Sequence, residues 1–366
     1  MKEIPFSSLN SIYATHAKEL EEAALRVLRS GWYILGNEVQ QFEKKFAAFN
    51  HANYCIGVNS GLDALTLAIR GLGLGEGDEI IVPAHTYIAT VLAVTENKAT
   101  PIFVEPDEYF NINVEKVEQV ITSKTKAILP VHLYGQPCNM DAIMALAKAY
   151  NLYVVEDCAQ SHGACYKGKM TGSFGDFGCY SFYPTKNLGA FGDAGAVITN
   201  SSELYHRMNM LRNYGSRSKY HHEIEGVNSR LDELQAALLS VKLQHLDSLT
   251  KERQQIAALY LEGIRNDYIE LPKTAPYANH VYHLFVIRLK ERDKLQTYLQ
   301  AKGISTQIHY PIPPHLAQCY SHLGYGAGDF PVAERYAQEC LSLPLYNGMN
   351  INDVEYVIQM INSFRV

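Results

Sequence analysis

Residues 177–189 read Phe-Gly-Cys-Tyr-Ser-Phe-Tyr-Pro-Thr-Lys-Asn-Leu-Gly, and this stretch decides the fold. Its apolar start, residues 177–182, has the length of a buried strand, and Pro184 ends that strand. Lys186 then stands between the strand end and a glycine-rich turn at residues 189–195, with no polar face around it. Burial disfavours the ammonium form, and a neutral lysine attacks carbonyl groups to form a Schiff base. The ordinary alternative is a lysine that extends from a loop into solvent.

The composition excludes several classes of protein. The chain has 366 residues, of which 47% are hydrophobic and 19% charged, and a net charge of -6. This balance is typical of a soluble globular protein and gives no reason to expect a nucleic acid or an anionic membrane as partner. Residues 1–6 have no long apolar stretch, so we expect no signal peptide. The seven cysteines form no C-x-x-C pair, which favours reduced core residues and a cytoplasmic location.

Apolar runs alternate with helical patterns on both sides of this stretch. We expect strands at residues 54–58, 79–82, 100–104, 127–133, 152–155, 177–182 and 194–199. Helices are expected at residues 17–29, 39–50, 64–72, 86–96, 114–121, 140–150 and 204–211. This alternation predicts an α/β fold with a mostly parallel seven-stranded sheet and helices on both faces.

A second, smaller domain is predicted after residue 250. A helix at residues 231–249 continues toward Ile264, and residues 214–228 before it read as a polar loop. Strands are then expected at residues 282–289 and 304–309, with helices at residues 292–302, 331–341 and 351–364. We therefore expect a large α/β domain at residues 1–250 and a small α+β domain at residues 251–366.

The loop at residues 30–36 is apolar and aromatic, and it contains the only tryptophan, Trp32. Exposed loops are seldom this apolar, so it packs either on a ligand or partner chain, or into its own core.

Several strand ends carry residues that suit a ligand, because open parallel sheets bind ligands at the carboxyl ends of their strands. Residues 60–62 precede a helix and offer backbone N–H groups to a phosphate, although they also read as an ordinary helix cap. Tyr87 offers a ring for stacking, although a single tyrosine is commonly a core residue. Of Glu156 and Asp157, only one can face the site, because consecutive strand residues point in opposite directions.

Together these groups meet the four needs of pyridoxal phosphate (PLP). The four needs are a phosphate cradle, a stacking ring, a carboxylate for the pyridine nitrogen and a lysine for the aldehyde. Ser181 adds a hydroxyl near Lys186.

The chain also resembles the DegT/DnrJ/EryC1/StrS sugar aminotransferases, which have the fold of type-I PLP enzymes. The matching stretches are residues 30–36 (SGWYILG), 59–65 (NSGLDAL), 83–90 (PAHTYIAT), 130–136 (PVHLYGQ), 156–163 (EDCAQSHG), 181–186 (SFYPTK), 226–237 (GVNSRLDELQAA) and 309–315 (HYPIPPH). They cover nearly the whole chain. Two departures are small: Leu62 stands where the family often has threonine, and Cys158 where alanine is common.

The resemblance implies a role for each matching residue. Lys186 corresponds to the Schiff-base lysine and proton shuttle, and Asp157 to the partner of the pyridine nitrogen. The other implied cofactor contacts are Ser60, Gly61, Leu62, Tyr87, Gln160, Ser181 and Asn228. Gln160 corresponds to the contact to the 3-oxygen, and Asn228 to a residue that reaches the phosphate of the neighbouring subunit. The resemblance thus implies a homodimer with shared active sites.

The pieces at residues 280–286 and 309–311 look most like the subgroup that acts on dTDP-3-keto-6-deoxyhexoses. The implied reaction moves the amino group of L-glutamate to C3 and gives a dTDP-3-amino-3,6-dideoxyhexose, of gluco or galacto configuration, for a glycan such as an O-antigen or S-layer. The candidate substrate contacts are Tyr183, Lys219, Arg230, His309 and Tyr310. The tyrosine and histidine candidates have an ordinary alternative, because these residues often form hydrogen bonds with one another at domain interfaces. The loop that contains Lys219 has one as well, since it can simply be a solvated polar loop.

Four alternatives stand beside this reading. Amination at C4 of a 4-keto sugar is the nearest one. A Rossmann-type oxidoreductase would need G-x-G-x-x-G after the first strand, whereas Gly71, Gly73, Gly75 and Gly77 have another spacing and follow a helix. A regulator on the same scaffold, or the dehydratase variant with histidine at the lysine position, would lack Lys186 or Asp157, and both are present.

Overall fold

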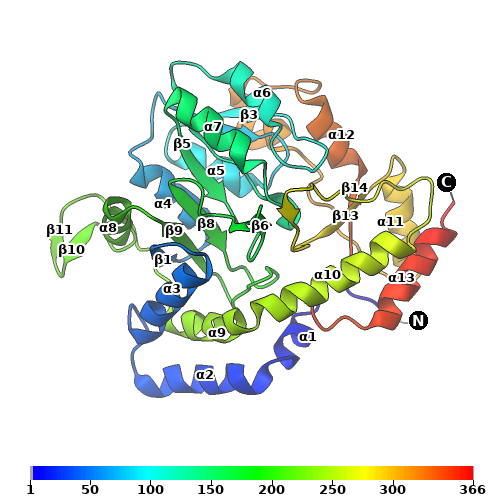
Figure 1. The fold of residues 1–366 in the computed structure, drawn as a ribbon, viewed down its shortest axis with the longest axis horizontal. Coiled ribbons are helices and arrows are strands. Elements are labelled where there is room, and N and C mark those ends of the chain that lie inside the picture. Colours follow the sequence, from blue (N-terminus) through cyan, green and yellow to red (C-terminus); the bar gives the residue numbers. More distant parts are fainter. Residues whose placement is uncertain (1–2, 366) are drawn as a thin grey trace.

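The computed structural model describes residues 3–365 and centres on one large sheet (Figure 1). The seven strands lie in the order β1-β9-β8-β5-β4-β2-β3. Their bounds are β1 (Tyr54–Val58), β2 (Glu79–Pro83), β3 (Thr100–Val104), β4 (Thr125–Ile128), β5 (Tyr153–Asp157), β8 (Phe177–Ser181) and β9 (Gly195–Thr199). Strand β9 is antiparallel to its neighbours β1 and β8, and the other pairs are parallel. The predicted seven-stranded, mostly parallel sheet is confirmed.

The reversal at β9 follows from its connection. Residues 182–194 contain neither helix nor strand. Parallel neighbours need a crossover, usually a helix. The chain instead turns back on itself, and β9 pairs antiparallel with β8. This returning connection carries Lys186.

Helices cover both faces of the sheet. Before and around the sheet lie α1 (Leu9–Ala14), α2 (Ala17–Ser30), α3 (Asn37–Phe49), α4 (Gly61–Gly71), α5 (Ile88–Glu96), α6 (Val114–Val117), α7 (Met140–Tyr150), α8 (Ser202–Leu211), α9 (Glu233–Gln244) and α10 (Leu246–Gly263). Strand β2 shows the two-sided packing. Ile80 and Val82 join the core cluster of α4 and α5, whereas Ile81 joins the cluster of α7. Alternate side chains thus enter opposite cores, as expected for a strand buried on both faces.

The C-terminal region (residues 264–365) packs beside this sheet at the end of α10 (Figure 1). It contains α11 (Arg292–Ala301), α12 (Pro331–Glu339), α13 (Ile351–Ser363) and the antiparallel pair β13 (Phe285–Arg288) and β14 (Cys340–Leu343). Its core extends from Ile256 to Phe364 and includes Ile4 from the other end of the chain. The boundary at residues 250/251 stays a prediction, and α10 crosses it.

Some predicted elements were wrong. Residues 304–309 form no strand; Ile304 pairs with Ile4 and Gln307 with Ser342, each as an isolated bridge. The helix predicted at 331–341 ends at Glu339, and the four buried residues of β14 follow it. A short apolar run does not distinguish a strand from a buried helix segment. The helix predicted from 231 toward 264 is divided between α9 and α10 at His245.

Smaller differences lie in the loops. Strand β4 ends at Ile128 rather than Leu133, because Pro130 has no backbone N–H to continue the ladder. The polar loop at 214–228 contains a hairpin, β10 (Ser216–Ser218) with β11 (His221–His222). A small sheet that was not predicted joins β12 (Ala278–Asn279), β6 (Cys165–Tyr166) and β7 (Lys169–Met170). Short 3-10 turns occur at residues 118–120, 133–135, 314–316 and 318–323.

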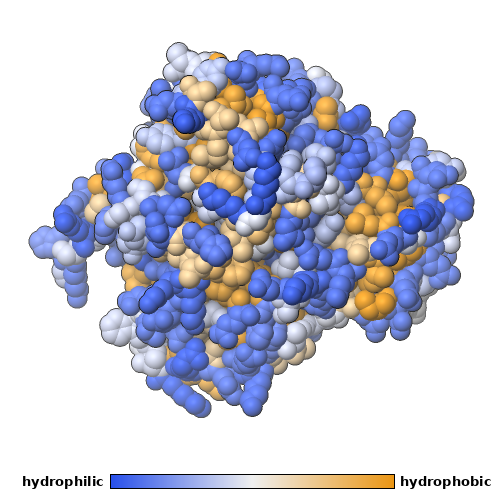
Figure 2. Space-filling view, in the orientation of Figure 1, coloured by the Kyte–Doolittle hydropathy of each residue, from blue (hydrophilic) through white to orange (hydrophobic). Residues whose placement is uncertain are grey.

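The surface view in Figure 2 is mostly hydrophilic, with separate apolar groups near the centre and over the C-terminal region. Among the described residues 3–365, the helices are all too short or too polar to cross a membrane. The seven cysteines are all free.

Candidate active site

A cavity of about 1050 Å³ opens at the carboxyl ends of the parallel strands. Its walls come from the segments at residues 59–62, 86–92, 157–160 and 181–186, and from residues 305–310 of the C-terminal region. This is where an open α/β sheet binds its ligand. The cavity is at the upper end of the usual range for small-molecule pockets, so it has room for more than one small group.

Lys186 lines this cavity and does not extend into open solvent. Its backbone N–H donates to the carbonyl of Tyr183 at 2.8 Å, which tightens the turn after β8. Burial lowers the pKa of the Lys186 amine from 10.5 to about 8, and the carboxylate of Asp157 partly offsets this. About a tenth of this amine is therefore neutral at pH 7, and the neutral form is the nucleophile.

Asp157, at the end of β5, faces the cavity, and its neighbour Glu156 does not. Burial raises the pKa of Asp157, and four groups oppose that rise. The backbone N–H of Ala159 donates to Oδ1 at 3.1 Å, and the hydroxyl of Thr90 donates to Oδ2 at 2.9 Å. Electrostatic interactions with Lys186 and His132 add to their effect. The two donors hold the carboxylate in one orientation.

Glu156 points to the opposite face of the sheet, where its role is structural. Its carboxylate accepts backbone N–H bonds from Gly172, Phe174 and Gly175 at 2.7–2.8 Å. It also lies 3.0 Å from Nε2 of His132. The expectation that only one of the two adjacent carboxylates faces the site agrees with this geometry.

The start of α4 has the features of an anion site. Ser60 is the N-cap, and its hydroxyl accepts the N–H of Asp63 at 3.1 Å. Gly61 follows with no side chain, and a Cβ there would lie 2.5 Å from the Cβ of Ser181. This close approach places the Ser181 side chain beside the free N–H groups of the helix. Such a helix N-terminus attracts a phosphate through its dipole and its unpaired donors.

The opposite wall is a network of polar side chains. The Gln160 amide oxygen accepts the backbone N–H of Tyr134 at 2.6 Å, and its nitrogen donates to the hydroxyl of Tyr310 at 3.0 Å. These partners fix the orientation of the amide. The ring of Tyr87 lies 5.2 Å from that of Tyr310 and is about half exposed at the cavity mouth. Nδ1 of His309 lies 2.8 Å from the hydroxyl of Ser342.

Most of the predicted site residues therefore meet in one cavity. Those that line it are Ser60, Gly61, Leu62, Tyr87, Asp157, Gln160, Ser181, Tyr183, Lys186, His309 and Tyr310.

Three predicted residues do not line the cavity of their own chain. Lys219 lies at the exposed tip of the β10–β11 hairpin, which extends away from the sheet (Figure 1). Asn228 is exposed, and its backbone pairs with that of Asn213 in an isolated antiparallel β-bridge. The guanidinium of Arg230 donates to Oδ1 of Asn213 at 3.1 Å and lies 5.5 Å from the centre of the Tyr214 ring.

Sequence reasoning missed many residues of the wall, and three of these make polar contacts that organise it. Thr90 is three positions after Tyr87 in the first turn of α5, a spacing that places both on one helix face. His283 lies 3.2 Å from Oδ1 of Asn187, next to Lys186. Arg253, buried in α10, donates to the carbonyl groups of Tyr282, His283 and Leu345. Only Thr90 had a sequence signal, because the other two reach the site through the tertiary fold.

The loop at residues 30–36 is not folded into its own core. The exposed fractions are 64% for Trp32, 51% for Tyr33 and 41% for Ile34. Such a group of exposed apolar side chains is typical of an interaction surface.

The fold and the site define an α/β protein that places an activated lysine, a carboxylate and an anion cradle in one cavity. The sequence profile of the DegT/DnrJ/EryC1/StrS aminotransferase family matches residues 14–362, and the chain belongs to this family.

Three similar proteins illustrate the relationship. The dTDP-3-amino-3,6-dideoxy-alpha-D-galactopyranose transaminase of Aneurinibacillus thermoaerophilus is 54% identical over 99% of both chains. The dTDP-3-amino-3,4,6-trideoxy-alpha-D-glucose transaminase of Streptomyces venezuelae is 51% identical over 93% of this chain and 91% of its own. The crystal structure of S. venezuelae DesV with a ketimine intermediate superposes with a TM-score of 0.97, at 48% identity, over 99% of this chain and 98% of that one.

Proposed function

We propose that this protein is a PLP-dependent aminotransferase that moves the amino group of L-glutamate to C3 of a dTDP-3-keto-6-deoxyhexose. The products are 2-oxoglutarate and a dTDP-3-amino-3,6-dideoxyhexose. The observation that carries the proposal is the meeting of Lys186 and Asp157 in a cavity that also has an anion cradle. Relatives that are about half identical and are described as 3-amino-sugar transaminases support the substrate class.

The residues of the cavity fit the cofactor. The start of α4 offers backbone N–H groups to a phosphate. Gly61 has no side chain, which lets Ser181 approach these N–H groups closely, since a Cβ on residue 61 would collide with Ser181. Asp157 is a buried carboxylate held by two donors, which suits a protonated ring nitrogen. Structures of more distant relatives hold PLP or its pyridoxamine form. When bound, the cofactor supplies an electron sink for the carbon that loses a proton.

Each side chain then has a physical task. Lys186 would hold the cofactor through its amine and, when that amine is free, would serve as the acid–base group that moves a proton in the cavity. Asp157 keeps the ring nitrogen protonated by its negative charge. Gln160 lines the cavity and has one N–H left to donate to a ligand, because its oxygen and its other N–H are engaged. Tyr87 covers the ring from the mouth.

The sugar would enter past the C-terminal region. His309 and Tyr310 from this region and Tyr183 from the lysine turn surround the mouth of the cavity. We propose these three as sugar contacts. The configuration at C4 stays open. One of the relatives above is named for a galactopyranose, and the other is named for a 3,4,6-trideoxy sugar, which has no hydroxyl at C4.

We further propose a homodimer whose two sites are shared. The exposed aromatic loop at residues 30–36 supplies an apolar surface for a second copy. Asn228, Arg230 and Lys219 lie outside the cavity of their own chain, so they contribute to a site only across an interface. Seven free cysteines agree with action in the reducing cytoplasm, and an amino sugar of this kind serves glycan assembly.

A half-reaction tests the proposed function. The enzyme is converted to the pyridoxamine form with L-glutamate, the glutamate is removed, and dTDP-sugars with a 3-keto or a 4-keto group are added. Return of the visible absorption of lysine-bound cofactor with the 3-keto sugar alone is the expected result. Return with the 4-keto sugar alone would move the amination to C4. No absorption band at any stage would refute the cofactor assignment.

The assignment of Lys186 has its own test. Lys186→Ala should retain the cofactor through the anion cradle and lose turnover. Full activity in this variant would end the assignment of Lys186.

A further inference from the structure

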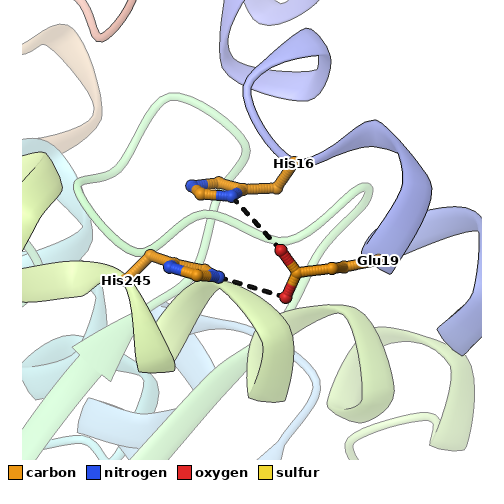
Figure 3. A group of neighbouring side chains, drawn as sticks. All are labelled: His16, Glu19 and His245. Carbon is orange, nitrogen blue, oxygen red and sulfur yellow. Dashed lines mark hydrogen bonds and ion pairs between the residues drawn. The ribbon is translucent and has the colours of Figure 1, made fainter.

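Two histidines and a glutamate meet at the starts of two helices that are far apart in the sequence. His16 directly precedes α2, and Glu19 lies in the first turn of that helix. His245 is the residue between α9 and α10. Figure 3 shows both imidazole rings directed toward one carboxylate. None of the three lines the active-site cavity.

The distances bring three ligand atoms together. Nε2 of His245 lies 3.2 Å from one oxygen of Glu19, and Nδ1 of His16 lies 3.7 Å from the other. The potential ligand atoms of the three side chains all lie within 4.8 Å of one another. With metal bonds of ~2.0–2.1 Å, neighbouring ligands of a tetrahedral ion are about 3.4 Å apart. The two measured distances, each to a different oxygen of Glu19, fall on either side of this value.

The ordinary roles of such residues do not explain this cluster. Neither His16 nor His245 caps its helix through a side-chain hydrogen bond. Nδ1 of His16, the nitrogen that faces Glu19, lies 3.7 Å from the carboxylate, which is too long for a hydrogen bond.

The chemistry of the three side chains, two imidazoles and one carboxylate, suits one class of metal ion. Neutral imidazole and carboxylate are ligands of zinc and its neighbours, whereas magnesium and calcium prefer oxygen alone.

We propose that His16, Glu19 and His245 form a site for a divalent transition metal ion of the zinc type, with the fourth position open to water. Three protein ligands and an open position are a common arrangement for this ion. The pair His16 and Glu19 is spaced i, i+3 at a helix start, which places both side chains on one face.

Two features limit the affinity. The rings are stacked with centroids 3.8 Å apart and planes 12° from parallel, so they must rotate for their lone pairs to converge. The helix starts carry a partial positive charge, and Lys242 acts as a nearby positive charge on His16. We therefore expect weaker binding than at a closed site with four protein ligands.

A bound ion would fasten α2 to the junction of α9 and α10. Helix α9 also supports the turn after Lys186. The Lys242 ammonium donates to the carbonyl of Gly189 at 2.5 Å, and the Gln235 side chain accepts the N–H of Phe191 at 2.8 Å. The site is therefore structural, and its expected effect is on stability rather than on the chemical step.

A second cluster of the same composition does not carry a site. His132, Glu156 and Cys158 are all buried. The carboxylate of Glu156 already accepts three backbone N–H groups, and Nδ1 of His132 accepts the N–H of Cys138. A metal ion would have to displace these bonds.

The test uses the full chain without an affinity tag, loaded with PLP and freed of metal with a chelator. Calorimetry and thermal unfolding are measured with Zn²⁺ and Co²⁺, with Mg²⁺ as the negative control. Glu19→Gln and His245→Gln remove one ligand each, and His206→Gln changes an exposed histidine elsewhere as the matched control. X-ray absorption at the metal edge identifies the ligands in the unmodified protein, independently of any variant.

We expect one Zn²⁺ per chain, a higher melting temperature and an absorption spectrum with imidazole and oxygen ligands but no sulfur. Affinity should fall at least about tenfold in both ligand variants and not in His206→Gln. The unmodified enzyme should transaminate equally well with and without the metal. Absence of Zn²⁺ binding, sulfur ligands in the spectrum, or unchanged affinity in Glu19→Gln and His245→Gln would each overturn the site.

Discussion

The hydroxyl of Thr90 donates a 2.9 Å hydrogen bond to the carboxylate of Asp157 inside the cavity. The two residues come from α5 and β5, and the bond opposes the rise in the pKa of Asp157 that burial causes. A residue outside the sequence-predicted site thus helps to keep Asp157 ionised. This relationship leads to the first prediction.

Thr90→Val should weaken the function of Asp157 while leaving the helix and its packing volume nearly unchanged. A hydrogen bond to a charged group contributes about 1.5–3 kcal/mol, so we expect kcat to fall roughly 10- to 100-fold. Thr90→Ser retains the hydroxyl and should remain close to the unmodified enzyme. Steady-state kinetics of the two variants across pH is the measurement, and equal activity in both would contradict the role of this bond.

Lys186 should give cofactor attachment a distinct pH dependence. Its pKa is lowered to about 8 by burial, and only the neutral amine attacks the aldehyde. The rate of covalent attachment to the cofactor-free protein should therefore rise about tenfold per pH unit below 8 and level off above it. Stopped-flow absorption measures this rate. A rate that still rises steeply well above pH 9 would show an unshifted lysine.

The same shift affects the stability of the cofactor-free protein. The folded pKa of about 8 lies below the ordinary value of 10.5, so the unfolded chain binds more protons between these values. Stability contributed by this group should accordingly rise as the pH increases from 8 to 10.5 and stay constant below 8. Lys186→Met should remove this part of the pH dependence. Urea unfolding of both proteins over this range compares them directly, and parallel curves would exclude a lowered pKa.

Gly61→Ala should damage the anion cradle. The new Cβ would lie 2.5 Å from the Cβ of Ser181, and forced overpacking costs about 1–3 kcal/mol. We expect weaker retention of PLP during dialysis and weaker binding of inorganic phosphate. Gly326→Ala is the matched control, because nothing lies within 4 Å of a Cβ there. Unchanged cofactor retention in Gly61→Ala would mean that the phosphate binds elsewhere.

Shared active sites predict complementation between two inactive chains. If Asn228 reaches the site of its partner, Lys186→Ala and Asn228→Ala homodimers should both be impaired. Hybrids prepared by mixing should contain one intact site of two and regain about half of the activity of the unmodified dimer. Chromatography and activity of the separated hybrid provide the measurement. A hybrid that is no more active than its parents would refute the shared site.

The sequence determined the sheet and most of the candidate site. Apolar runs and helical periodicity are patterns of residues that are neighbours in the sequence. The strands β1 and β3 and the helix α7 could therefore be placed from their own residues alone. The carboxyl ends of parallel strands meet at one edge, which is why Asp157 and Lys186 could be expected together before any coordinates were known. The alternation of side chains along a strand likewise separated Asp157 from Glu156.

The tertiary structure decided what depends on distant parts of the chain. Strand β14 forms because residues 340–343 find β13 as a partner, not because of their own pattern. His283 and Arg253 enter the cavity wall from the C-terminal side, and the exposure of Trp32 follows from the way its loop is placed. Glu19 and His245 are 226 positions apart and still share a hydrogen bond. Local patterns describe a residue's neighbours in the sequence, whereas a cavity, a metal cluster or a shared interface depends on which elements pack together, and that is settled only by the folded chain as a whole.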